Sequence, residues 1–142
     1  MNSKMKKILI LCTGNSCRSQ MMHGFLKTLA SHKAEAWSAG VEKHGLNQNA
    51  LKYLKQIEGI DISNHTSNLV DDYAEIDFDY VITVCDNANE RCPIFPSSAK
   101  KFHHNFFDPS KVCGSEKEIE KAFTQTISEL KEYTLKFIES EL

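Results

Sequence analysis

The sequence predicts an α/β fold: a single three-layer domain over residues 1–142, with a four-stranded parallel sheet and helices on both faces. Two nearly continuous apolar runs, at residues 8–12 and 79–84, are typical of strands that are covered on both faces. Segments with apolar side chains at every third or fourth position alternate with these runs. Strands that alternate with helices are joined by right-handed crossovers and pair in parallel. A chain of 142 residues without internal repeats or linkers has the size of one domain.

The first strand is expected at residues 8–12, and a helix should follow from Ser19. Its apolar face would consist of Met22, Phe25, Leu26, Leu29 and Ala30. A moderate second strand is expected at residues 34–38, closed by Ala39 and Gly40.

A second helix should begin after Asn47 or Asn49, since either side chain can cap it, and Gly59 should end it. The buried-strand candidate at residues 79–84 then runs directly into Cys85. The second half of the sheet is therefore expected to begin at this strand.

Residues 86–101 contain Pro93 and Pro96 and are expected to form a loop rather than a helix. A short last strand is expected at residues 102–106. A long amphipathic helix should run from Glu116 to the end of the chain. Its apolar face would consist of Ile119, Phe123, Ile127, Leu130, Tyr133 and Phe137.

The composition excludes several classes of function. The formal net charge of -2 leaves no basic excess for binding nucleic acid or an anionic membrane. No apolar stretch reaches the length of a membrane span, and the run at residues 8–11 is too short for a signal peptide. Five cysteines without a secretion signal indicate a reducing compartment, so a cytoplasmic monomer is expected.

The strongest functional signal is a polar loop between the first strand and the first helix. It consists of Cys12, Thr13, Gly14, Asn15, Ser16, Cys17, Arg18 and Ser19. Backbone N–H groups of such a loop, and the positive end of the following helix, can surround a tetrahedral oxyanion. Arg18 can bind two of its oxygens, and the positive field should lower the pKa of Cys12 and make it a thiolate nucleophile. The alternative is an unrelated buried cysteine and surface arginine, but the strand and the Gly/Ser-rich turn favour the anion site.

A second pair of cysteines, Cys85 and Cys92, is separated by six residues. Cys85 and Cys12 both follow strands, and ligands of parallel sheets bind beyond the carboxyl ends of strands. A thiol–disulfide relay from Cys12 to Cys85 to Cys92 is therefore chemically coherent. One alternative is a zinc site with His103 and His104, although the spacing of the cysteines is wide for zinc. Another is that Cys85 is only a buried thiol.

Asp108, followed by Pro109, is a candidate proton donor for the departing oxygen. The alternative is a plain Asx turn before proline. Cys17 lies inside the anion loop and is more readily explained as a loop residue than as a partner of Cys12. Cys113 has no assigned role.

These residues resemble the low-molecular-weight protein tyrosine phosphatases, and more specifically the thioredoxin-coupled arsenate reductases built on that fold. The resemblance rests on CTGNSCRSQM from Cys12, SAG from Ser38, IDISNHTS from Ile60, VITVCDNANERCP from Val81 and the Asp-Pro pair at Asp108. It covers nearly the whole chain. Phosphatases of this fold share the loop without needing the second cysteine pair.

The resemblance implies reduction of arsenate to arsenite, with phosphate or sulfate as competing oxyanions. Cys12 would attack arsenate held by Arg18, with Asp108 protonating the leaving oxygen and Ser19 stabilising the thiolate. A Cys12–Cys85 disulfide would form first and a Cys85–Cys92 disulfide second, and thioredoxin would reduce the latter. No bound cofactor is implied. The loop alone would equally serve a tyrosine phosphatase, and a redox-sensing module would not explain Arg18.

The sequence departs from the family at a potassium site that some members carry beside the anion loop. The corresponding positions here are Asn15, His23, Ser38 and Asn68, so both family carboxylates are missing. No metal site is expected. Ser110 and Lys111 follow the Asp-Pro pair where such phosphatases usually carry tyrosines, which favours a small inorganic oxyanion.

Overall fold

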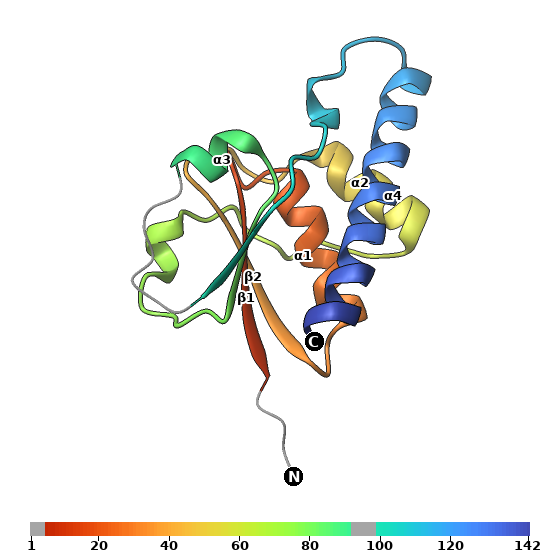
Figure 1. Ribbon diagram of the computed structural model, residues 1–142. Coiled ribbons are helices and arrows are strands. Elements are labelled where there is room, and N and C mark those ends of the chain that lie inside the picture. The colour runs from red at the N-terminus through yellow and green to blue at the C-terminus, as the bar shows by residue number, and fades with distance from the viewer. Residues whose placement is uncertain (1–4, 92–98) are drawn as a thin grey trace.

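The computed structural model describes residues 5–91 and 99–142 (Figure 1). Its sheet has four parallel strands in the order β2-β1-β3-β4. The strands are β1 (Lys6–Cys12), β2 (Ala34–Gly40), β3 (Tyr80–Thr83) and β4 (Lys100–His103). Leu9 of the central strand β1 pairs with Trp37 on one side and Val81 on the other. The predicted four-stranded parallel sheet is confirmed.

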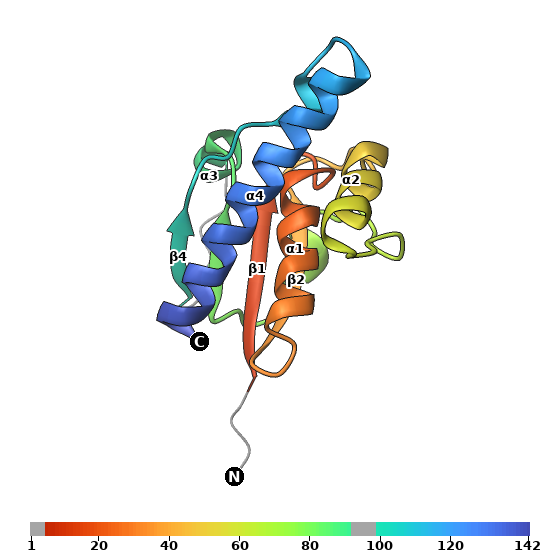
Figure 2. The ribbon, with the colours of Figure 1, turned by 90° about the vertical axis from the view of Figure 1, so that its right-hand side faces the viewer.

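Helices lie on both faces of the sheet, but unequally. The four α-helices are α1 (Arg18–Leu29), α2 (Gln48–Glu58), α3 (Asp86–Arg91) and α4 (Glu116–Glu141), with short 3₁₀ turns η1 (Val70–Tyr73) and η2 (Pro109–Lys111). Figures 1 and 2 show α1, α2 and α4 together on one face, with α3 and η1 on the other side. Because all four strands run in the same direction, the loops at their carboxyl ends meet at one edge of the sheet.

The core lies between the sheet and the layer that contains helices α1 and α4. Every side chain from Ile8 to Leu11 is fully buried, as the uninterrupted apolar run predicts for a central strand. The helices contribute the buried side chains Met21, Met22, Phe25 and Leu26 from α1, and Phe123, Ile127, Leu130 and Phe137 from α4. Each such side chain contributes roughly 1.5–3 kcal/mol relative to an exposed one. Leu29, which the spacing placed on the apolar face of the first helix, is exposed.

Two expected elements are wrong in type or position. Residues 86–91 form helix α3 rather than a loop, because both prolines lie beyond its last residue and Cys85 supplies an acceptor at its first turn. The last strand is residues 100–103 rather than 102–106. Its pairing is set by β3, which is also only four residues long.

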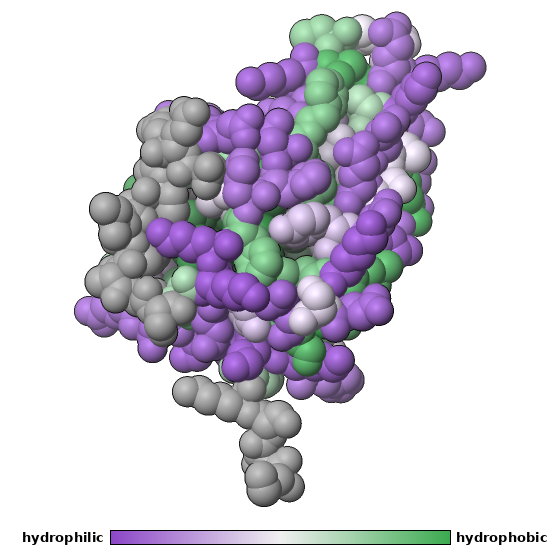
Figure 3. Space-filling model, viewed as in Figure 1, coloured by the Kyte–Doolittle hydropathy of each residue, from purple (hydrophilic) through white to green (hydrophobic). Residues whose placement is uncertain are grey.

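The expected ends of α2 and α4 are confirmed by their capping groups. The Asn47 side chain accepts from the Ala50 N–H at 2.9 Å, which decides between the two candidate caps. Gly59 ends the helix in a left-handed conformation with φ of 71°. Ser115 caps α4. None of the helices in the described ranges combines the length and apolarity needed to cross a membrane, and the face in Figure 3 is largely hydrophilic.

Candidate active site

The loop between β1 and α1 turns its carbonyl oxygens outward. The carbonyl oxygens of Thr13, Gly14, Asn15 and Ser16 all accept hydrogen bonds from groups that support the loop. The donors are the backbone N–H groups of Glu42, His44 and Asn47 and the side chains of Ser67 and Gln20, at 2.8 to 3.0 Å. A trans peptide unit that directs its C=O outward directs the N–H of the next residue to the opposite side. The loop N–H groups are therefore left to converge on an oxyanion, as the sequence predicted.

Two backbone positions make this tight turn possible. Asn15 has φ of 47° and is the only non-glycine with a left-handed backbone among the described residues. Gly40, at the end of β2, lies against the loop so closely that a Cβ there would come within 2.8 Å of the Asn15 nitrogen and the Thr13 oxygen. A side chain at this position would push the loop away from the sheet.

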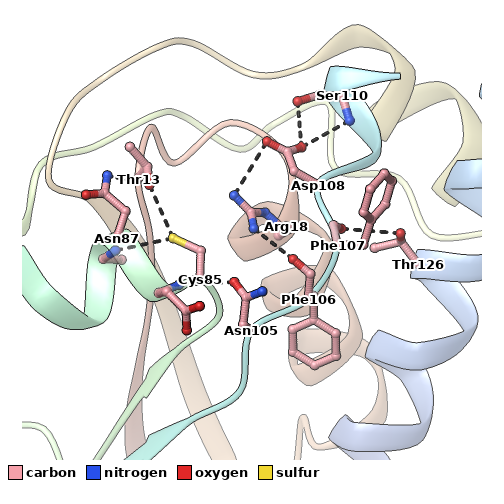
Figure 4. A network of polar contacts seen from close by, with 12 residues as sticks. Thr13, Arg18, Cys85, Asn87, Asn105, Phe106, Phe107, Asp108, Ser110 and Thr126 are labelled. Carbon is pink, nitrogen blue, oxygen red and sulfur yellow. Dashed lines mark hydrogen bonds and ion pairs between the residues drawn. The ribbon is translucent and has the colours of Figure 1, made fainter. Parts of the chain in front are cut away.

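Arg18 is buried beneath the loop and is oriented by the segment that follows β4. Its Nη1 donates to the Phe106 carbonyl at 2.8 Å, and its Nη2 lies 3.5 Å from Asp108 Oδ2 (Figure 4). Its Nε has no hydrogen-bond partner within the described ranges. A buried guanidinium donor without a partner is costly, and a tetrahedral oxyanion would supply the missing acceptor.

Asp108 forms the Asx turn that one sequence interpretation predicted, and its carboxyl group also reaches the anion loop. Its Oδ1 accepts from the Ser110 N–H at 3.0 Å and from the Ser110 hydroxyl at 2.6 Å, so it caps η2 in an Asx-type turn. Its other oxygen faces Arg18 at the anion loop. The preceding residue is held to α4, since Thr126 donates to the Phe107 carbonyl at 3.4 Å. The turn therefore fixes a carboxyl group at the edge of the oxyanion site.

The fold brings Cys12 and Cys85 into direct hydrogen-bond contact, although they are far apart in the chain. Both thiols are free and buried. The hydrogen bond with Cys85 and burial raise the pKa of Cys12, while Arg18 and the Ser19 N–H lower it. The expectation of a depressed Cys12 pKa is therefore wrong in this structure, because the neighbouring sulfur outweighs the arginine.

The surroundings of Cys85 favour its thiolate. The hydrogen bond from Cys12, together with donors at Thr13 and the Ala88 N–H, lowers the pKa of Cys85 to about 5, although burial acts in the opposite direction. The Thr13 hydroxyl lies 3.2 Å from the Cys85 sulfur and the Ala88 N–H 3.4 Å (Figure 4). Asn87 donates to the Thr13 hydroxyl oxygen at 3.1 Å, which leaves the hydroxyl proton free to point at the sulfur. Sequence patterns gave no sign of Asn87.

The Ser19 hydroxyl is directed to the loop backbone rather than to the nucleophile. It donates to Asn15 Oδ1 at 2.9 Å, and it is the Ser19 N–H that bonds to Cys12. Cys17 is buried and burial raises the pKa of its thiol strongly, so it is an inert loop residue in this arrangement. Cys113 is exposed beyond η2, and Cys92 lies outside the described residues.

The pocket above the loop is polar. Its lining consists of Cys12, Thr13, Gly14, Ser16, Cys17, Arg18, His44, Cys85, Asp86, Asn87, Asn105, Asp108, Ser110 and Lys111. Within the described parts of the chain, its only aromatic ring is the His44 imidazole. The sequence analysis missed His44 and Asn105, because neither belongs to a local motif and both reach the pocket through the packing of loops.

The two histidines of the alternative zinc site have other partners. His103 lies 2.7 Å from both the Thr83 hydroxyl and an Asp86 carboxylate oxygen. The His104 ring packs against Phe106 and Tyr133, with centroids 4.5 and 5.2 Å away. Across residues 5–91 and 99–142, no group of three or more His, Cys, Asp or Glu side chains is placed to hold a metal.

The four positions of the family's potassium site bond to protein groups. Asn15 Nδ2 donates to the Ser38 carbonyl at 3.1 Å and the Asn68 carbonyl at 3.5 Å. His23 Nδ1 lies 2.9 Å from the Ser38 hydroxyl. Burial, aided by His65 and Lys27, lowers the pKa of His23 to about 3. An imidazole that stays neutral therefore lies where the family carries a carboxylate.

The buried His23 should make the fold sensitive to acid. Because its pKa falls from 6.5 in the unfolded chain to about 3 in the folded protein, the unfolded state binds the proton first. Stability is fully present above pH 6.5 and is lost as the pH falls toward 3. At pH 5 the loss is roughly 2 kcal/mol, at about 1.36 kcal/mol per pKa unit.

Urea denaturation at pH 7 and pH 5 measures this effect. His23→Asn should lose about 2 kcal/mol less stability than the wild type over that interval. His32→Asn removes a histidine from an exposed turn and is the matched control. Equal losses in wild type and His23→Asn would exclude His23 as the source of acid sensitivity.

Comparison with known proteins identifies the family. Residues 7–142 match the family model of the low molecular weight phosphotyrosine protein phosphatases. The chain is 46% identical over 113 residues to an arsenate reductase of Bacillus subtilis, covering 80% of this chain and 81% of the relative. It is 43% identical over 135 residues to an arsenate reductase of Shouchella clausii, covering 95% and 96%.

A solved structure of an arsenate reductase in the phosphate binding state superposes with a TM-score of 0.73 at 30% identity. The match covers 93% of this chain and 98% of that one. The chain belongs to the low molecular weight phosphotyrosine protein phosphatase family.

Proposed function

We propose that this protein reduces arsenate to arsenite by a relay of three cysteines, with thioredoxin as the reductant. The observation that carries the proposal is the hydrogen-bonded pair of Cys12 and Cys85 at the base of the oxyanion loop. A phosphatase of this fold needs one thiol at that place. A second thiol in contact with the first, with its pKa lowered to about 5, is suited to attack the first sulfur.

The first step is an attack of the Cys12 sulfur on arsenic. A bond forms between sulfur and arsenic, and one arsenate oxygen leaves as water with a proton from Asp108. The hydrogen bond between the two sulfurs gives the Cys12 proton a direct path to Cys85. Arg18, whose Nε is free to donate, would bind the oxyanion beside the loop N–H groups.

The second step transfers the electrons. The Cys85 thiol gives the proton that it received to a departing arsenite oxygen, and its sulfur attacks the Cys12 sulfur. A disulfide forms, and the pair of electrons of the broken sulfur–arsenic bond stays on arsenic. Arsenic is thereby reduced by two electrons and leaves as arsenite, while two thiols are oxidised to one disulfide. Once uncharged, Cys85 is a much weaker acceptor for the Ala88 N–H, so the first turn of α3 loses its cap.

The third step regenerates the site. Cys92 attacks Cys85, the Cys12 thiolate departs, and the Cys85–Cys92 disulfide is reduced by thioredoxin. Names of relatives support the arsenate reductase assignment, since the proteins of Bacillus subtilis and Shouchella clausii carry that name. The thioredoxin coupling and the order of disulfides rest on the resemblance of the cysteine motif and on the contact of Cys12 with Cys85.

The test is arsenate-dependent consumption of NADPH with thioredoxin and thioredoxin reductase. Cys85→Ser and Cys92→Ser should each reduce steady-state turnover to background, because the relay lacks a sulfur. Both variants should still hydrolyse 4-nitrophenyl phosphate slowly, since that reaction requires only Cys12, Arg18 and Asp108. Cys113→Ser, which removes an exposed thiol outside the relay, is the matched control and should retain full turnover. Full turnover in either relay variant would refute the relay.

The same loop supports a second candidate function, hydrolysis of phosphotyrosine. The favouring observation is the placement of Asp108 beside Arg18, which suits a cysteinyl-phosphate mechanism as well. The polar rim argues against it, because Ser110 and Lys111 line the pocket where an aryl ring would need a stacking partner. Comparing kcat/KM for phosphotyrosine with that for arsenate decides between the two.

A further inference from the structure

Asn15 is the residue on which the shape of the anion loop depends. It is fully buried and holds the left-handed backbone conformation that an L-residue adopts only when its surroundings impose it. Its side chain donates to the Ser38 carbonyl and accepts from Ser19, and its carbonyl accepts from Gln20 Nε2 at 3.0 Å. Whatever fixes Ser38 and Gln20 therefore fixes the turn that directs the N–H groups inward.

Gln20 is fixed by His65. The fully buried Gln20 amide donates from Nε2 to the carbonyls of Asn15 and Thr66, both at 3.0 Å. Its Oε1 lies 3.0 Å from His65 Nδ1. Since an amide oxygen can only accept, His65 must carry its proton on Nδ1. The His65 N–H therefore fixes the orientation of the Gln20 amide. In the reversed orientation, Gln20 Oε1 would face the Asn15 carbonyl oxygen, and two acceptors would repel each other.

Ser38 is fixed by His23. The Ser38 hydroxyl lies 2.9 Å from His23 Nδ1, and the His23 ring is also hydrogen-bonded to the backbone of Ala36. The two imidazoles stack, with centroids 4.3 Å apart and planes tilted by 30°. The Ser38 hydroxyl in turn donates to Gln20 Oε1 at 3.5 Å, so His23 acts on the Gln20 amide through Ser38 and His65 acts on it directly.

Both rings are uncharged near neutral pH. Burial lowers the pKa of each, and the Lys27 ammonium disfavours a second cation beside either ring. Asp61 is the opposing group, a carboxylate that raises the pKa of His65 but only as a minor contribution. An uncharged imidazole still carries one N–H, so His65 Nδ1 can donate to Gln20 Oε1 without a charge on the ring.

We propose that His23 and His65 are positioning residues for the oxyanion: the stacked pair holds Gln20 and Ser38, and these hold Asn15 in the turn that forms the anion cradle. Neither ring is among the residues that line the pocket. The effect is on the cradle itself, so it applies to phosphate as much as to arsenate. It therefore holds whether or not the relay exists.

The test measures the dissociation constant of inorganic phosphate by titration calorimetry at pH 7. His65→Leu removes the donor to Gln20 at similar volume and should weaken phosphate binding about tenfold, the change expected when a buried hydrogen bond is lost. His65→Asn places an amide N–H near the former Nδ1 and should restore affinity to within about threefold of wild type. His23→Leu and His23→Asn form the same pair on the Ser38 side.

The matched control is His32→Leu, on the exposed turn after α1, which should bind phosphate as the wild type does. A purely structural role would lower the melting temperature of His65→Leu and His65→Asn while leaving phosphate affinity intact. Wild-type affinity in His65→Leu, or equal weakening in both His65 variants, would overturn the proposal. If His65→Leu does not fold, Ser38→Ala removes one oxygen from the same network, and unchanged affinity there would overturn it equally.

Discussion

Cys12→Ser is expected to abolish both arsenate reduction and the hydrolysis of aryl phosphates, by on the order of 10⁴-fold or more. The serine hydroxyl can occupy the end of β1 and can still donate to Cys85, but it cannot form the sulfur–arsenic or sulfur–phosphorus bond on which both reactions depend. Single-turnover formation of arsenite and steady-state hydrolysis of 4-nitrophenyl phosphate measure the two losses separately.

The control for this variant is a measurement of phosphate binding. The loop N–H groups and Arg18 remain, so phosphate should bind Cys12→Ser with an affinity close to that of the wild type. A matched variant is Cys17→Ser, which changes the other buried thiol of the loop and should retain most of the activity. If Cys12→Ser still formed arsenite at an appreciable rate, Cys85 would have to be the attacking group, and the assignment of roles would be reversed.

Arg18→Lys is expected to lower kcat/KM for arsenate and for 4-nitrophenyl phosphate by about 10²- to 10³-fold. The substitution keeps the charge but replaces a planar fork with a point charge. It removes the donor to the Phe106 carbonyl and the Nε that is available to an oxyanion. The loss in kcat/KM therefore measures the contribution of the guanidinium geometry rather than that of its charge.

Lys111→Gln is the matched control, since it removes a cation from the rim of the same pocket. An exposed rim charge should change kcat/KM only a few-fold, and less at high salt. If Arg18→Lys stayed within about threefold of the wild type, the two-oxygen binding by the guanidinium would be wrong and a simple positive field would suffice.

Local patterns in the sequence predicted most of the fold. The apolar run at residues 8–11 predicted a doubly covered strand, and the spacing from Glu116 predicted a long amphipathic helix. Pro93 and Pro96 favour a loop over residues 86–101, but both lie beyond the last residue of α3, so they do not prevent this helix. The last strand lies at residues 100–103 rather than 102–106, because its limits are set by pairing with β3.

The sequence predicted which residues form the candidate site, but not the pKa values of its cysteines. The loop, Arg18 and the carboxyl group of Asp108 meet as the motif and the topology of a parallel sheet indicated. The contact between Cys12 and Cys85 was expected from the shared sheet edge. The lowered pKa of Cys85 was not, because it depends on a hydrogen bond to Cys12 and on donors at Thr13 and Ala88.

The sequence by itself determined a parallel sheet, a first strand that is covered on both faces, and a loop with a cysteine and an arginine at the end of that strand. Hydrophobic spacing and turn chemistry act between residues close in the chain, so a single sequence displays them directly. Only the tertiary structure showed that the surroundings of Cys85 lower its pKa and that the rings of His23 and His65 stack on one another. These features arise from burial and from hydrogen bonds between distant segments, and the pKa of a buried group follows its neighbours in space rather than in sequence.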